Sequence, residues 1–156
     1  MRDKSMAKNA DSKTSDLSRK LQQLLIQGAL PGELEGFGTR EQKTAAEFLV
    51  ALLSHRPAGA PVIAIETIPT DTAHRQMRIG IINDDMPFLV DSVAAEIAAH
   101  GLSISRVLHP VASVVRDASG QLGDIGARNA SGNESIIYME LERADARVRR
   151  QLEEGR

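Results

Sequence analysis

The densest group of residues that could do chemistry lies between Ile81 and Val93, in the sequence IINDDMPFLVDSV. Two adjacent carboxylates, Asp84 and Asp85, follow an apolar run and precede Pro87. Acidic side chains here can accept hydrogen bonds from the free amides of a helix start and meet the positive end of its dipole. Pro87 suits a first helical turn because its missing N–H would be unpaired there. The pattern predicts either a helix cap without further function or a turn that offers carboxylates to a ligand.

The histidines are the other candidates for acid–base or metal chemistry. His100 is predicted at a helix C-terminus, where the helix dipole favours a partly charged imidazole, and His109 precedes a proline within a strand. His55 and His74 fall at a helix end and in a loop. Because the chain has no cysteine and no His-x-x-x-His spacing, we expect no metal site.

Nothing in the sequence indicates a nucleophile or a dinucleotide-binding turn. Ser92 lies beside Asp91 in a predicted helix, but no glycine-flanked turn presents its hydroxyl. The segment 36–38, Gly-Phe-Gly, lacks the third glycine of a dinucleotide-binding motif, and no strand precedes it. We therefore expect no catalytic residue and no cofactor in this chain.

Composition narrows the class of protein further. The chain has 156 residues, which fits one domain. Its 19 basic and 21 acidic residues give a net charge of −2, which argues against a nucleic-acid partner. No apolar run approaches the roughly 20 residues that a membrane span requires, so we expect no membrane partner and a cytoplasmic location.

The first part of the chain predicts a tail and two helices. Residues 1–15 are polar and carry mixed charges, so we expect a disordered tail. Residues 16–60 predict a helical hairpin whose second helix starts at Thr39. The apolar residues of the hairpin fall on one face of each helix: Leu17, Leu21, Leu24 and Leu25, then Ala45, Phe48, Leu49, Leu52 and Leu53. Helices this short are unstable alone, so each apolar face must pack on something.

Residues 61–156 predict a mixture of strands and helices. The expected order is strand Val62–Thr67, strand Met77–Ile82, helix Pro87–His100, strand Leu102–Arg116, a long mobile loop Asp117–Asn133, strand Glu134–Glu142 and helix Ala144–Glu154. Pro110 lies within the third strand, where it cannot donate to a neighbour, so this strand must be bulged there or lie at a sheet edge.

From Met77 onward, this order matches an antiparallel ferredoxin-like βαββαβ domain without its final strand. The chain can be a fragment of a longer protein, or strand 62–67 can take the vacant edge beside strand 77–82. The two explanations are compatible, and covering that edge would protect it from unwanted pairing.

Four segments resemble one family in the same order: NDDMPFLVDSV, HGLSISRVLHPV, RDASGQL and ESIIYMELER. The pattern Asp-x-Pro-x-Leu after a strand, followed by a helix and Ser-Ile-Ser, is similar to an ACT regulatory domain. More narrowly, residues 62–143 resemble the N-terminal part of the very long-chain bacterial NAD-specific glutamate dehydrogenases.

The resemblance implies an α+β fold, an ACT-like antiparallel sheet with helices on one face, preceded by the helical hairpin and an extra edge strand. It implies a non-catalytic regulatory or interaction domain of an enzyme that uses NAD to convert L-glutamate to 2-oxoglutarate and ammonia. ACT domains bind amino acids at the turn after their first strand. The ligand-binding residues implied here are Asp84, Asp85, Met86, Pro87 and Phe88, where Phe88 stands in a position that is often glycine.

The expected partners are the downstream domains of the parent enzyme, an amino-acid effector and further copies in a homo-oligomer of the parent. The alternative is an oligomerisation or domain-docking module without a ligand. An exposed sheet edge and the apolar faces of the helical hairpin, which have no evident partner in the sequence, favour this alternative. A free-standing enzyme ranks last.

Overall fold

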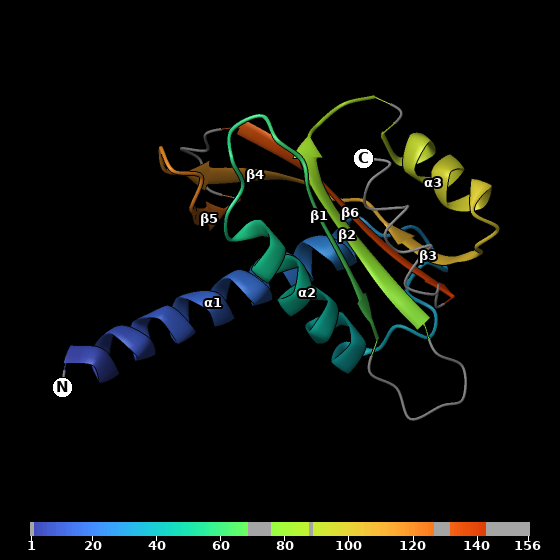
Figure 1. The fold of residues 1–156 in the computed structure, drawn as a ribbon. Coiled ribbons are helices and arrows are strands. Elements are labelled where there is room, and N and C mark those ends of the chain that lie inside the picture. Colours follow the sequence, from blue (N-terminus) through green and yellow to red (C-terminus); the bar gives the residue numbers. More distant parts are fainter. Residues whose placement is uncertain (1, 69–75, 88, 127–131, 143–156) are drawn as a thin grey trace.

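The described residues form an antiparallel sheet with helices on both of its faces (Figure 1). The computed structural model describes residues 2–68, 76–87, 89–126 and 132–142. The elements are α1 (Arg2–Gln27), α2 (Thr39–Leu53), β1 (Val62–Thr67), β2 (Gln76–Asp84), α3 (Leu89–Ala99), β3 (Ile104–Leu108), β4 (Val111–Arg116), β5 (Leu122–Ile125) and β6 (Gly132–Glu142). In the described residues no helix is long and apolar enough to cross a membrane.

The sheet runs in the order β1-β2-β6-β4-β5, and β3 pairs with the other half of β6. β1 pairs antiparallel with the side of β2 that β6 leaves open, with Ile63 opposite Ile81. The prediction that strand 62–67 takes the vacant edge is therefore confirmed. This arrangement, α+β with a curled antiparallel sheet, is the ACT-like fold expected from the sequence.

β3 and β4 are the two halves of the long strand predicted over residues 102–116. They are separated at Pro110, yet both halves keep the same register with β6. The carbonyl of Pro110 still accepts a hydrogen bond from the amide of Ile136 at 3.0 Å. The sequence predicted a bulge or a sheet edge at Pro110. The register with β6 does not shift there, and among the described strands β3 pairs only with β6, so this half of the predicted strand lies at an edge.

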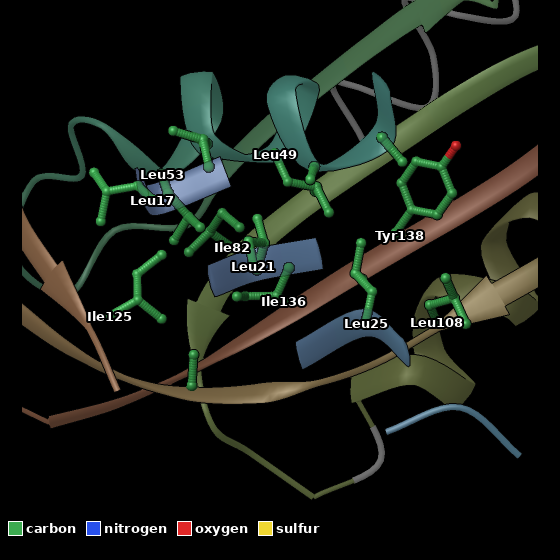
Figure 2. Close-up of a cluster of buried hydrophobic side chains, with 14 of the residues drawn as sticks. Leu17, Leu21, Leu25, Leu49, Leu53, Ile82, Leu108, Ile125, Ile136 and Tyr138 are labelled. Atoms are coloured by element: carbon green, nitrogen blue, oxygen red, sulfur yellow. The ribbon is translucent and has the colours of Figure 1, made fainter. Parts of the chain in front are cut away.

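Alternate side chains of β2 and β6 face opposite helices, because successive strand residues point to opposite sides of a sheet. On one face α1 and α2 form the larger core with the even-numbered positions of these strands. Figure 2 shows leucines of both helices directed toward β2 and β6. The main members are Leu17, Leu21 and Leu25 of α1, Leu49 and Leu53 of α2, Ile82 of β2, and Ile136 and Tyr138 of β6.

The other face of the sheet carries α3. Leu89, Val93 and Ile97 of α3 pack on a run of odd-numbered strand residues. These are Met77, Ile79 and Ile81 of β2 and Ile137, Met139 and Leu141 of β6. The helix predicted over 144–154 lies outside the described residues.

Two expectations differ from the structure. α1 begins at Arg2, so the disordered tail expected over residues 1–15 is wrong for the backbone of 2–15. Residues 2–27 contain no Gly or Pro that would end a helix. The packed turns of α1 already form a helix nucleus, so each preceding residue can extend the helix without a further nucleation cost. Figure 1 shows this first part of α1 extending beyond the sheet.

The segment predicted as a long mobile loop contains β5, which pairs with β4. Leu122 and Ile125 of β5 are buried in the larger core, so their burial outweighs the high glycine content of this stretch. Residues 127–131 lie outside the described residues.

Candidate functional site

The turn after β2 holds the ligand-binding residues expected from the sequence. Asp84 is the last residue of β2, and Asp85, Met86 and Pro87 follow it as exposed residues. Met86 is an exposed apolar side chain, with 46% of its surface accessible. α3 begins at Leu89, so Pro87 lies in the turn rather than in the first helical turn. Phe88 lies outside the described residues.

Asp84 binds an arginine of a distant segment. Its Oδ1 accepts a hydrogen bond from Arg56 at 3.0 Å, and Arg56 is only 4% exposed. Arg56 follows α2, and Figure 1 shows the loop after α2 and the turn after β2 at the same end of the sheet. The ion pair therefore joins two segments that are distant in the sequence.

Arg56, Asp84, Arg116 and Glu134 form one group, which we call the Arg56 cluster. Arg56 donates to Glu134 Oε2 at 2.9 Å, and Arg116 donates to both oxygens of Glu134, each at 2.9 Å. Asp84 lies opposite Glu134 in the pairing of β2 with β6, which places both carboxylates beside Arg56. Burial alone would raise the pKa of Glu134. The hydrogen bonds from Arg116 and Arg56 outweigh burial and hold that pKa below its ordinary value of 4.5.

The turn between β4 and β5 fixes Arg116 and Arg56 in place. Asp117 accepts hydrogen bonds from the backbone amides of Ser119 and Gln121, which shapes the turn. Gly120 has a φ of +90°, and its carbonyl accepts from the amide of Arg56 at 3.0 Å. A Cβ on Gly120 would lie 2.3 Å from the carbonyl oxygen of Arg56, so this turn requires glycine. The segment RDASGQL thus docks on the end of α2.

A second polar group anchors the helices to the middle of β6. The hydroxyl of Tyr138 donates to Glu140 Oε2 at 2.6 Å, and Arg106 of β3 donates to Glu140 Oε1 at 2.8 Å. Burial, reinforced by the negative charge of Glu140, raises the pKa of Tyr138 above its ordinary value of 10.0. Arg106 also lies over the ring of Phe37, 4.6 Å from its centroid. These contacts tie the loop between α1 and α2 to the sheet.

The described histidines lie apart from one another. His100 follows α3 and is 3.3 Å from Glu96, within one helix turn, as a helix-end position implies. His109 lies between β3 and β4 with Nε2 hydrogen-bonded to Ser135 Oγ. His55 is bonded to the carbonyl of Ser119 at 2.9 Å. Among the residues that the structure describes, no three His, Cys, Asp or Glu side chains are grouped to hold a metal.

The residues at the start of α3 do not fit a dinucleotide. A pyrophosphate needs a glycine-rich turn between a strand and a helix N-terminus, where the backbone can approach it closely. Here the corresponding turn carries Asp84 and Asp85, whose negative charges would repel a phosphate.

Sequence reasoning missed Arg56, Arg116 and Glu134 as partners of the turn. One signal was available: Glu134 is the first residue of the predicted strand 134–142, and it shares a face with Ile136 and Tyr138, which pack on the helical pair. A charge on the buried face of a strand needs an opposite charge close by.

Comparison with known proteins agrees with this arrangement. The family model of the ACT1 domain of glutamate dehydrogenase matches residues 21–155. The NAD-specific glutamate dehydrogenase of Pseudomonas aeruginosa is 38% identical over 69 residues, which are 42% of this chain and 4% of that protein. The chain thus spans a small part of the length of this curated relative. No solved structure matches the chain. Because the family match covers most of the chain, from the last two turns of α1 onward, the chain belongs to the family of glutamate dehydrogenase ACT1 domains.

Proposed function

We propose that this chain is a regulatory domain, with no catalytic step of its own, in a longer NAD-dependent glutamate dehydrogenase. The catalytic part of that protein would oxidise L-glutamate with NAD to 2-oxoglutarate and ammonia in the cytoplasm. The observation that carries the proposal is the match to the ACT1 family over residues 21–155. The partners of the domain would be the downstream domains and further copies of the parent.

The turn from Asp84 to Phe88 is the proposed receiving site for an amino-acid effector. Met86 offers an exposed apolar contact, and the exposed carboxylate of Asp85 can attract the effector's ammonium group. Regulation then requires that the effector bind one arrangement of the parent's domains more tightly than another.

Isothermal titration of this chain with a panel of amino acids tests the proposal. We expect saturable heat with at least one of them, and a weaker affinity when Met86 is replaced by alanine. Leu30→Ala is the matched control, because Leu30 is an apolar residue that is 69% exposed in the loop between α1 and α2. Absence of heat with every amino acid would exclude an amino-acid sensor.

The alternative function, an oligomerisation or docking module without a ligand, rests on β1. Among the described strands β1 pairs only with β2, so it is an edge strand of the described sheet. Ile63 and Ile65 are half-buried and line an apolar hollow together with Val93 and Ile97 of α3. The apolar faces of the helical hairpin no longer favour this alternative, since the chain's own sheet covers them. Size-exclusion chromatography with light scattering tests it: a strict monomer at high concentration counts against self-association through β1.

A further inference from the structure

The Arg56 cluster contains equal numbers of positive and negative groups but buries them unequally. Arg56 and Glu134 are almost fully buried, and the Arg116 side chain is 9% exposed. The Asp84 side chain is 60% exposed. Asp84 is therefore the member that can separate from the cluster most easily, because its carboxylate is already largely hydrated.

Departure of Asp84 would unbalance the group. Within the Arg56 cluster, two guanidinium groups would then face a single carboxylate, Glu134, in a buried position. Arg56 would keep the carbonyl of Ala60 at 2.6 Å and Glu134 at 2.9 Å as its acceptors. An unneutralised positive charge in such surroundings weakens the structure around it.

The structure around Arg56 is the end of α2. The amide of Leu122 donates to the carbonyl of Ser54 at 2.9 Å, and the amide of Arg56 donates to that of Gly120 at 3.0 Å. Arg116 closes the same junction by donating to the carbonyl of Leu53 at 2.8 Å. All three bonds join the end of α2 to the hairpin of β4 and β5.

We propose that the ion pair between Asp84 and Arg56 couples the turn after β2 to the end of α2. A partner that moves the turn and draws Asp84 away from Arg56 loosens the junction between α2 and the β4–β5 hairpin. The coupling requires no other domain, because all of its residues lie in this chain. This goes beyond the proposed function, because it names the contacts through which a movement of the turn after β2 changes the packing of α2.

Amide hydrogen exchange measured by NMR on the whole chain tests the coupling without any effector. We compare wild type with Asp84→Asn and follow the amides of Arg56 and Leu122, with the amide of Leu102, bonded to Ile97 at the end of α3, as the reference. Because a hydrogen bond to a charged group is lost, exchange at the two reporters should rise about tenfold while the reference stays unchanged.

Asp85→Asn is the matched control, since it removes the same charge one residue away from the cluster. It should leave both reporter amides as they are in wild type. Exchange within about twofold of wild type in Asp84→Asn, or an equal rise in both variants, would overturn the coupling.

A double-mutant cycle guards against a general loss of stability. Arg56→Lys keeps the charge but loses the forked donor geometry of the guanidinium. If the two residues are coupled, Asp84→Asn should change exchange at Leu122 much less in the Arg56→Lys background than in wild type. Equal effects in both backgrounds would contradict the proposal. A missing calorimetric response to amino acids would leave this result untouched, so failure of the effector site and failure of the coupling are distinguishable.

Discussion

Gly80 of β2 lies directly beneath the ring of Phe48 of α2. A Cβ on Gly80 would lie 2.9 Å from the ring carbon Cε2 of Phe48 and 3.0 Å from a methyl carbon of Leu52. Opposite Gly80 in β6 stands Tyr138, whose ring meets that of Phe48 edge-on at 6.4 Å between centroids. The missing side chain at position 80 thus lets α2 seat an aromatic ring against the sheet.

Gly80→Ala should therefore destabilise the chain. The added methyl group overpacks the contact and should cost about 1–3 kcal/mol in the free energy of unfolding. The melting temperature should fall by roughly 2–12 °C, measured by circular dichroism together with urea unfolding. Gly123→Ala in β5 is the control, because a Cβ there has no neighbour closer than 3.4 Å. A Gly80→Ala variant as stable as this control would show that α2 does not pack against β2 in this way.

Gly120→Ala should lower the free energy of unfolding by more than the strain of a positive φ alone. Gly32 has a φ of +92° with open space around it, so Gly32→Ala reports the backbone strain, about 1–2 kcal/mol. Gly120→Ala adds a collision with the carbonyl of Arg56 and should cost at least about twice as much in urea unfolding. Equal losses in the two variants would mean that the turn does not dock on the end of α2.

The pKa of Glu134 should lie below its ordinary value in the folded chain. Its pKa in the folded chain is predicted below 4.5, the value taken for the unfolded chain. The unfolded state then binds more protons in that range. The stabilisation is fully present above pH 4.5 and is lost as pH falls through the lower, folded value. A side-chain carboxyl titration by NMR measures this pKa directly, and a value at or above 4.5 would contradict the arrangement.

Removal of Arg116 should raise the pKa of Glu134 relative to wild type. In Arg116→Gln the strongest hydrogen-bond partner is gone, so burial should carry the pKa of Glu134 upward relative to wild type. Arg19→Gln is the control, because Arg19 pairs with Asp16 on an exposed face of α1. The same titration in that variant should reproduce the wild-type value.

Local sequence patterns predicted most of the elements that surround the site. The alternation of apolar residues gave β6, and the edge position of the strand before Pro110 followed from its missing donor. The place of β1 followed from counting strands, because a βαββαβ order without its last strand leaves one edge of β2 open.

The Arg56 cluster was not predictable in the same way. Its members come from four segments, and their meeting depends on the register that sets Asp84 opposite Glu134. A shift of one residue would turn Glu134 to the other face of the sheet. The start of α1 was missed for a related reason, since composition indicated disorder while packing of Leu17, Leu21 and Leu25 supports the helix from its other end.

Backbone NMR of the whole chain during titration with the amino acids used for calorimetry tests the central claim most directly. The claim is that the turn after β2 receives the effector of this regulatory domain. We predict saturable shifts at the amides of Asp85, Met86 and Leu89, with no change at Gly32 in the distant loop between α1 and α2. Saturable shifts confined to other parts of the chain, or no shifts with any amino acid, would contradict it.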